Sequence, residues 1–454
     1  MAKYKMTIEE TLKKRKYKIP SNLTWWAYAV LARSPFFGPK YHVHYEKIDD
    51  PRDCKTGCFI IWNHQSRRDY LFLKNLIAPK KFNMVAGYNE FFRKKFAWIF
   101  EKAQVLPKKN FTSDPVGVRA ISTIIKQGGC VAFSPEGTSS IYGHNQPIVP
   151  GTGRFLQFFR VPVYVMHLEG SYLTSHKVCI DDRPGRVNAS IRLMFTPEQL
   201  KEMTPEQIDN AINEEFRFDD YEWNKTARVK YKTKGKPCTN LDYICYKCPK
   251  CGEEMCIEAH DNIVKCQKCG NGCHINDYYD MLPFDDTCKI PVSPSAWFDW
   301  ERISVINEIR NNKDYSLSFK VKMGKLPDYK PIKDNAALAL ICGKGTFTID
   351  HQGLHYQGTK DGEEFKFDVN YDIYYTLSIE NDLTEFSVYV GGKMYEFFPL
   401  EHIGGKAMMV TEEMHRLHFN YWKNFPWFAY MYHGTELEVE NDNYEEEVKK
   451  LFLN

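Results

Sequence analysis

His64 and Asp69 are the residues whose types and spacing best suit catalysis. A carboxylate that hydrogen-bonds one imidazole nitrogen leaves the other nitrogen free to take a proton from a hydroxyl group. The pair lies between an apolar run, residues 58–62, and a segment with helical periodicity, residues 70–76. On one continuous helix the two side chains would be turned about 500° apart. They can meet only if His64 precedes the helix, and we expect Ser66 at its N-cap and Asp69 in its first turn.

The H-x4-D spacing alone is weak evidence, because it recurs at residues 44–49 and 176–181 in a chain with 14 histidines. Only the copy formed by His64 and Asp69 leads from an apolar run into a helix. It is also followed, about seventy residues later, by the sequence PEGT at residues 135–138. Of the three H-x4-D pairs, we therefore consider the pair His64 and Asp69 the candidate for catalysis.

An H-x4-D pair followed by PEGT resembles the glycerolipid (PlsC-type) acyltransferases, which transfer a fatty acyl group to a lysophospholipid or glycerol phosphate. Two further stretches of that family can be placed at Gly87–Lys109 and Arg160–Pro162, and the resemblance covers roughly residues 20–215. It implies that His64 is the general base and that Asp69 orients and charge-stabilises its imidazole.

The resemblance also implies an acceptor site. It would be shaped by the PEGT turn, with Lys109 in the place of a basic residue associated with the acceptor's phosphate. A solvated lysine is an equally good interpretation of Lys109, and a helix cap is the alternative for Glu136. The family usually reads EGTRS, whereas this chain has Ser139 in the position of the arginine. The charge partner of a phosphate would then be Lys109 or Arg154. The expected site residues of the turn are Glu136, Gly137 and Thr138.

A cysteine cluster forms the strongest local motif. Seven of the 14 cysteines lie between Cys245 and Cys273, which favours a metal site in a reducing compartment over a disulfide framework. Two C-x2-C pairs, each followed by glycine, are separated by fourteen residues. This pattern resembles a zinc ribbon and predicts a structural Zn²⁺ bound by four thiolates. The expected ligands are Cys248, Cys251, Cys266 and Cys269.

The order of predicted elements indicates a multidomain chain. Strands alternating with helices predict an α/β acyltransferase domain with a mostly parallel sheet. The β-rich stretch after the cysteines predicts an all-β barrel of the pleckstrin-homology type with a terminal helix, and a two-sheet sandwich is the rival. The predicted parts are a basic, aromatic N-terminal helix (1–40), the acyltransferase domain (41–225), a linker with the zinc ribbon (226–285), the all-β domain (286–425) and an aromatic, then acidic, tail (426–454).

Composition limits the partners of the chain. A net charge of +3 over 454 residues creates no strong field for nucleic acid, so we expect no nucleic-acid binding. No signal peptide is visible, and no uninterrupted apolar run reaches the ~18–20 residues of a membrane span. Residues 21–37 are aromatic and follow a lysine-rich segment, which suits a helix in the bilayer interface; an ordinary packed helix is the alternative. We expect a peripheral protein on the cytoplasmic face of a bacterial membrane.

These observations predict an O-acyltransferase. The acyl donor would be acyl-coenzyme A or acyl-carrier protein, and the favoured acceptor is lysophosphatidic acid, which would yield phosphatidic acid. No covalent acyl-enzyme is needed, so the cysteines are not required as nucleophiles. The alternative is a non-catalytic adaptor, built on an acyltransferase scaffold, that binds membrane lipid or protein. The sequence leaves open whether the β-rich part binds a headgroup or a protein.

Overall fold

The computed structural model of the chain describes residues 6–34, 39–179, 181–333, 339–372, 374–380, 383–418 and 445–453. Most of the predicted aromatic and acidic tail (426–454) lies outside these residues. Within them, no helix is both long enough and apolar enough to cross a bilayer.

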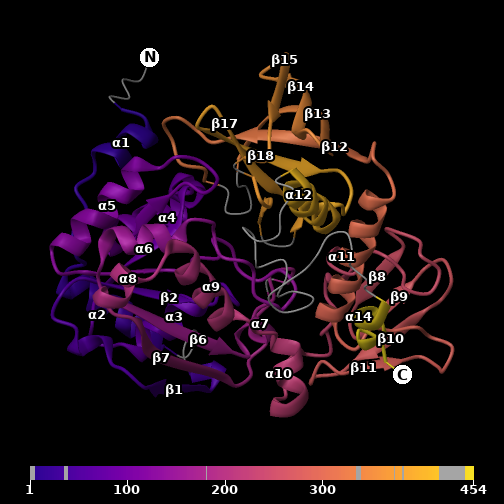
Figure 1. Cartoon of the computed structure of the whole chain (residues 1–454), viewed down its shortest axis with the longest axis horizontal. Coiled ribbons are helices and arrows are strands. Elements are labelled where there is room, and N and C mark those ends of the chain that lie inside the picture. The colour runs from indigo at the N-terminus through magenta and orange to yellow at the C-terminus, as the bar shows by residue number, and fades with distance from the viewer. Residues whose placement is uncertain are drawn as a thin grey trace.

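The N-terminal half is organised around a seven-stranded sheet (Figure 1). Its strand order is β1-β7-β6-β2-β5-β3-β4, and every pair is parallel except β6 with β7. The central strand β2 is buried at all five positions. The prediction of a mostly parallel sheet is therefore confirmed. The strands are β1 (Val43–Lys47), β2 (Cys58–Trp62), β3 (Phe82–Gly87), β4 (Leu106–Lys108), β5 (Cys130–Phe133), β6 (Val163–Glu169) and β7 (Val187–Phe195).

Helices cover both faces of this sheet. Side chains of α2 and α3 pack on one face, and those of α5, α6 and α9 pack on the other. Each helix buries an apolar stripe, as 3.6-residue periodicity requires. The helices of this half are α1 (Ile8–Lys14), α2 (Asn22–Arg33), α3 (Asp69–Leu76), α4 (Lys94–Ala103), α5 (Pro115–Lys126), α6 (Thr152–Phe159), α7 (Ser171–Thr174), α8 (Pro197–Glu202), α9 (Pro205–Phe216) and α10 (Asp220–Ala227), with short 3-10 turns at η1 (Pro39–Tyr41), η2 (Pro51–Asp53) and η3 (Tyr88–Phe92).

A cysteine-rich module, residues 238–290, follows. It holds an antiparallel sheet of order β11-β10-β9-β8. A sheet this small buries little apolar surface and needs further support to be stable. Its elements are η4 (Leu241–Tyr243), β8 (Ile257–His260), β9 (Ile263–Cys266), β10 (Gly272–Ile275) and β11 (Met281–Pro283).

The C-terminal β-rich part is a second seven-stranded sheet, fully antiparallel, of order β15-β14-β13-β12-β18-β17-β16. β15 and β16 are its two edges, so the described strands form an open sheet and not the predicted barrel. Helix α12 (Gly404–His418) packs on β13, and α14 (Glu445–Lys450) ends the described chain. The strands are β12 (Ser316–Lys325), β13 (Leu340–Asp350), β14 (Gly353–Lys360), β15 (Glu363–Val369), β16 (Ser378–Ile379), β17 (Phe386–Val390) and β18 (Lys393–Pro399).

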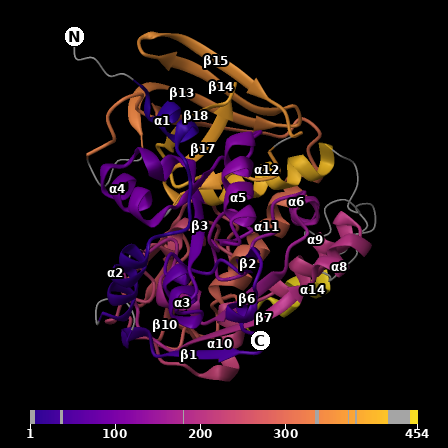
Figure 2. The ribbon, with the colours of Figure 1, turned by 90° about the vertical axis from the view of Figure 1, so that its left-hand side faces the viewer.

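A long helix was not predicted from the sequence. α11 (Pro294–Arg310) lies between the cysteine-rich module and the second sheet (Figures 1 and 2). Its signals were present: Ser293 caps it through its side chain, and Pro294 occupies the first turn. The helix is buried on most sides, so it lacks the amphipathic periodicity by which surface helices are recognised.

One hydrophobic cluster joins the parts of the chain. Buried residues of the first half, the cysteine-rich module, α11 and the second sheet form a single continuous cluster. Tyr142 of the first half stacks on Phe298 of α11 with ring centroids 4.1 Å apart. Phe111 stacks on Tyr374, which precedes β16, at 5.5 Å. The two halves are therefore packed together by apolar contacts and are not merely joined by a linker.

Candidate active site

The structure brings His64 and Asp69 together. His64 lies in the turn that follows β2, and Asp69 is the first residue of α3. The imidazole Nδ1 lies 2.8 Å from Asp69 Oδ2. The His64 side chain is 28% exposed, whereas that of Asp69 is 1% exposed. The carboxylate is thus enclosed while its imidazole remains open to a ligand.

Further donors hold the Asp69 carboxylate in place. The backbone N–H of Ser66 lies 3.1 and 3.0 Å from its two oxygens, and the Ser66 hydroxyl donates at 2.9 Å. The Ser171 hydroxyl, at the start of α7, donates at 2.7 Å. Ser66 is therefore not the N-cap that the sequence predicted: Arg68 holds that position, and the Ser66 hydroxyl accepts the Arg68 N–H at 3.1 Å while it donates to Asp69. Ser171 belongs to no motif, and sequence reasoning missed it.

Glu136 positions the backbone of His64. Its Oε1 accepts the His64 N–H at 2.7 Å, and its Oε2 accepts the Gln146 N–H at 2.6 Å. The side chain is 2% exposed. Burial raises the pKa of this carboxyl to about 8, and the two N–H donors oppose that rise. Ser140 completes the connection by donating its N–H to the His64 carbonyl at 2.7 Å. Glu136 thus orients the imidazole-bearing turn, and the contact with the acceptor that the sequence predicts for it stays a prediction.

Replacing Glu136 by alanine is expected to lower the free energy of unfolding by about 3 kcal/mol, because two inward-facing N–H groups lose their acceptor. Glu136→Gln keeps one acceptor oxygen and should lose roughly half as much. Thermal unfolding of both variants beside the wild type measures the difference. An alanine variant as stable as the wild type would show that solvent replaces the carboxylate, and that the PEGT acid does not support the His64 turn.

The remaining residues predicted for the acceptor site lie in different surroundings. Gly137 is exposed in the left-handed region with φ 73°, and the Thr138 hydroxyl accepts a hydrogen bond from Lys177. Lys109 forms an ion pair with Glu9 at 3.0 Å and lies over the ring of Tyr88. Its ammonium is therefore paired, through a carboxylate that Lys13 also contacts at 3.0 Å.

Arg154, the other cation predicted to face a phosphate, is exposed on α6. Lys177, which the sequence analysis did not consider, is buried beside the PEGT turn.

The four predicted cysteine ligands converge in the cysteine-rich module. Their sulfur atoms all lie within 4.8 Å of one another, with Cys248 and Cys269 3.6 Å apart and Cys251 and Cys266 3.8 Å apart. A tetrahedral zinc site with bonds of about 2.3 Å has sulfur–sulfur edges of about 3.8 Å. The arrangement of the sulfurs therefore fits Zn²⁺.

The backbone of the C-x2-C pairs fits as well. The glycines that follow them, Gly252 and Gly270, adopt φ 74° and 78°, and each donates its N–H back to the first cysteine of its pair. The left-handed conformation explains why glycine is required at both positions. A fifth sulfur, that of Cys256, lies 3.5 Å from Cys266 but is not a member of the four-sulfur group.

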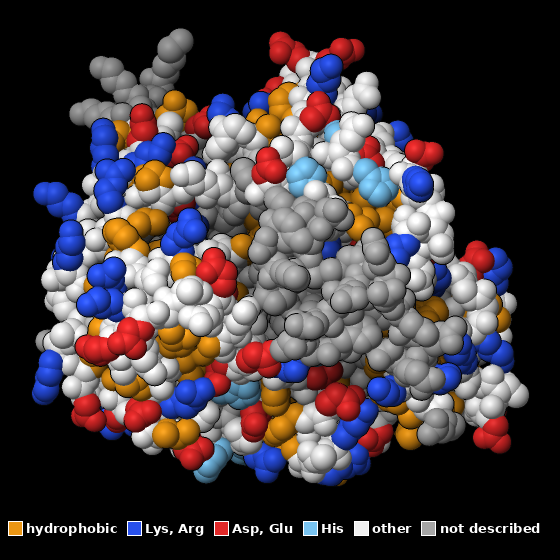
Figure 3. All heavy atoms as spheres, viewed as in Figure 1, with side chains coloured by type: hydrophobic (Ala, Val, Ile, Leu, Met, Phe, Trp, Pro, Cys, Tyr) orange, Lys and Arg blue, Asp and Glu red, His pale blue; other side chains and the backbone are white. Residues whose placement is uncertain are grey.

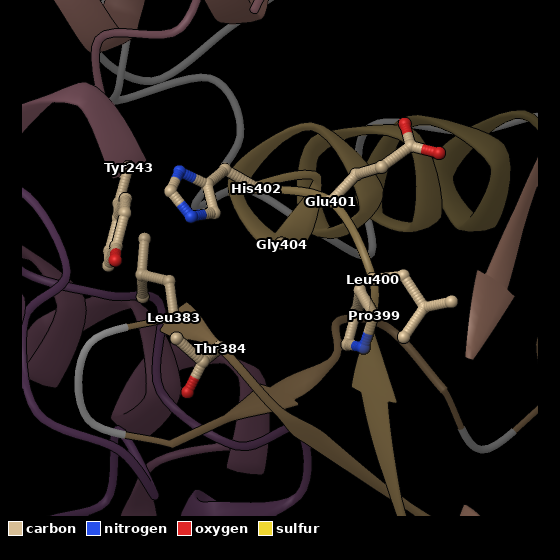
Figure 4. Close-up of a pocket in the computed structure, with 8 residues that line it drawn as sticks. All are labelled: Tyr243, Leu383, Thr384, Pro399, Leu400, Glu401, His402 and Gly404. Atoms are coloured by element: carbon tan, nitrogen blue, oxygen red, sulfur yellow. The ribbon is translucent and has the colours of Figure 1, made fainter. Parts of the chain in front are cut away.

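A pocket of about 160 Å³ lies elsewhere, where the cysteine-rich module meets the second sheet (Figure 4). Tyr243, Leu383 and His402 are among its lining residues, and His402 contacts the Tyr243 ring edge-on. None of the residues predicted for the acyltransferase site lines this pocket.

Comparison with known proteins identifies the segment that holds the dyad. Residues 40–168 match the model of the Acyltransferase family. This segment is an acyltransferase domain. It contains β1 to β6, His64, Asp69 and the PEGT turn.

Among solved structures, the fold is similar to the 1-acyl-sn-glycerophosphate (LPA) acyltransferase PlsC from Thermotoga maritima. The identity is 16%, the match covers 45% of this chain and 79% of that one, and the TM-score is 0.37. No curated protein matches the chain.

Proposed function

We propose that the chain transfers a fatty acyl group from an acyl thioester to the hydroxyl of a lysophospholipid, with lysophosphatidic acid as the acceptor. The observation that carries this proposal is the 2.8 Å contact between His64 Nδ1 and the buried, fully hydrogen-bonded Asp69, within an acyltransferase domain. A carboxylate so held orients the imidazole without having to reorganise during the reaction.

His64 acts as general base in this proposal. Its Nε2 takes the proton of the acceptor hydroxyl while that oxygen attacks the thioester carbonyl. Asp69 stabilises the resulting imidazolium. The tetrahedral intermediate collapses with cleavage of the carbon–sulfur bond, and the thiolate leaves and recovers the proton from Nε2. The products are an ester and a free thiol, so atoms and charge balance without a covalent acyl-enzyme. The donor is acyl-coenzyme A or acyl-carrier protein.

We assign a structural Zn²⁺ to Cys248, Cys251, Cys266 and Cys269, and consider the module a zinc ribbon. Four thiolates complete the coordination of the metal, so it stabilises the module and leaves no open position for substrate. The metal would therefore take no direct part in acyl transfer.

The experiment that tests the function is transfer of a labelled acyl group from each donor type to a panel of lysolipids. Wild type should acylate lysophosphatidic acid, and His64→Ala should reduce the rate by roughly 10²–10⁴-fold, as expected for the loss of a general base. His44→Ala is the matched control, because His44 has the same H-x4-D spacing but is exposed on β1. It should change nothing. Wild-type protein inactive with every donor and acceptor would favour the adaptor.

We also propose that α2 and α4 form the surface that meets the membrane. The two helices pack side by side (Figure 2), and each exposes large apolar side chains. Figure 3 shows Lys and Arg side chains gathered over the region of α1 and α5, the basic flank that an anionic bilayer would attract. The exposed apolar residues of the surface are Leu23, Trp26, Val30, Leu31, Trp98 and Ile99.

Replacing Trp26 and Trp98 together by serine is expected to weaken binding to phosphatidylglycerol vesicles at least tenfold. Each indole is about two-thirds exposed, and its transfer to the interface is worth about 1–2 kcal/mol. Vesicle co-sedimentation measures the effect, and Leu400→Ser, which removes an exposed apolar side chain after β18, is the control. Equal loss in the control variant would indicate that the vesicle contact is not located on α2 and α4.

A further inference from the structure

Lys177 is a buried lysine whose ammonium contacts neutral oxygens. Its side chain is 6% exposed, and its Nζ donates to the Thr138 hydroxyl and, at 3.4 Å, to the Ser139 carbonyl. No carboxylate of the described residues forms an ion pair with it. An ammonium held in this way keeps a donor for a further ligand, because it carries three N–H groups. Burying a cation without an acidic partner is costly, which points to a use for it.

The Lys177 ammonium lies beside the turn that holds the backbone of His64. Thr138 and Ser139 lie in the sequence between Glu136 and Ser140. Glu136 and Ser140 each form a hydrogen bond with the backbone of His64. In lysophosphatidic acid, only two carbon atoms and an ester oxygen separate the reacting hydroxyl from the phosphorus. A cation for the phosphate must therefore lie close to the imidazole, and Lys177 contacts the turn whose two ends hydrogen-bond the His64 backbone.

The segment that carries Lys177 is firmly held. Arg183 donates its backbone N–H to the Thr174 carbonyl at 2.8 Å, which closes the segment at its base. The adjacent His176 is buried and stacks on Tyr172 with ring centroids 4.6 Å apart. Asn240 of the cysteine-rich module donates to the Val178 carbonyl at 2.8 Å. The ammonium is thus positioned before any ligand arrives, which reduces the entropic cost of binding.

The other candidate cations are less suitable. Lys109 is paired with Glu9, and Arg154 is exposed on α6. Ser139 supplies no charge in the place where related enzymes usually have an arginine. We propose that Lys177 binds the phosphate of the acceptor and thereby makes the enzyme specific for phosphate-bearing lysolipids. This inference rests on the proposed acyl transfer and adds to it the residue that selects the acceptor.

The electrostatics of the site agree with this role. Burial lowers the pKa of Lys177 to about 8, and the charge of Glu380, which lies between β16 and β17, acts in the opposite direction. Glu380 already accepts a hydrogen bond from the Asn89 amide at 2.8 Å. A bound phosphate would favour the charged ammonium far more strongly, since opposite charges within about 4–6 Å raise the pKa of an amine.

The test compares two acceptors, lysophosphatidic acid and a monoacylglycerol, which lacks the phosphate. Lys177→Met removes the charge and keeps the length of the side chain. We expect KM for lysophosphatidic acid to rise about 10–100-fold, the value of a charge-assisted hydrogen bond. KM and kcat for the monoacylglycerol should change less than threefold. Adding Ser139→Arg to this variant should restore KM for lysophosphatidic acid.

The outcomes separate the inference from the function. Equal loss with both acceptors, or an unchanged KM for lysophosphatidic acid, overturns the role of Lys177 while acyl transfer stands. Wild-type protein that acylates neither acceptor overturns both. If Lys177→Met does not fold, the wild-type enzyme still decides: KM for lysophosphatidic acid should rise above about pH 8 while KM for the monoacylglycerol stays flat. Parallel pH profiles for the two acceptors would overturn the inference.

Discussion

Asp69→Asn is expected to slow acyl transfer by about 10²–10³-fold without unfolding the protein. The asparagine can keep its oxygen on His64 Nδ1 and turn its amide toward the hydroxyls of Ser66 and Ser171, which can rotate and accept. What disappears is the negative charge beside the imidazolium that forms in the transition state. At about 4 Å and an effective dielectric constant of 20, that charge is worth on the order of 4 kcal/mol. Each 1.36 kcal/mol corresponds to a tenfold change in rate.

Steady-state acyl transfer, with thermal unfolding as the check on folding, measures this loss. The effect should appear in kcat and in kcat/KM alike, because the interaction forms only as the proton moves. Asp49→Asn is the matched control: Asp49 has the same spacing from His44 but is exposed, and its carboxylate accepts a backbone N–H from Leu193. An Asp69→Asn enzyme within threefold of the wild-type rate would show that charge at this position is not part of catalysis.

The dyad was predictable from the sequence because its parts are local. A buried strand, a polar turn and a helix start within twelve residues determine where His64 and Asp69 lie. The groups that hold the dyad were not predictable, because they arrive from distant segments. Ser171 comes from the start of α7, 102 residues after Asp69. Glu136 was found, but a motif does not reveal that both of its oxygens accept backbone N–H groups.

Two features of the overall fold were mispredicted for the same reason, namely that they depend on contacts between distant segments. Alternation of apolar residues correctly predicted the β-rich character of residues 316–399, but periodicity carries no information on whether the first and last strands meet. They do not, and the sheet stays open. Periodicity also failed to predict α11, whose buried Trp297 and Phe298 join the cysteine-rich module to both halves of the chain. Contacts of this kind depend on tertiary structure and leave little trace in local sequence.

Because the cysteine-rich module shares buried residues with the rest of the chain, we expect that loss of its cysteine site will destabilise the whole protein. Cys248→Ser removes one of four thiolates, and we expect the protein to lose the Zn²⁺ that we propose there, together with the fold of the cysteine-rich module. In zinc-finger peptides, metal binding supplies about 10–16 kcal/mol, which is comparable with the whole stability of a typical domain. Since buried residues of the module lie in one cluster with Ile141 and Tyr142 of the acyltransferase domain, unfolding should spread to that domain and abolish transfer.

Metal analysis of the purified protein provides the measurement, and one zinc per chain is expected for the wild type. Cys256→Ser is a demanding control, because its sulfur lies 3.5 Å from that of Cys266 but outside the group of four. It should retain the zinc and the melting temperature, whereas Cys248→Ser should lose both. If instead Cys256→Ser loses the zinc and Cys248→Ser keeps it, Cys256 is a ligand and Cys248 is not. A wild-type protein that is fully stable without zinc would show that the metal does not support the fold. Because Cys256 lacks the trailing glycine that lets Cys251 and Cys269 close their turns, the first result is the one that the backbone favours.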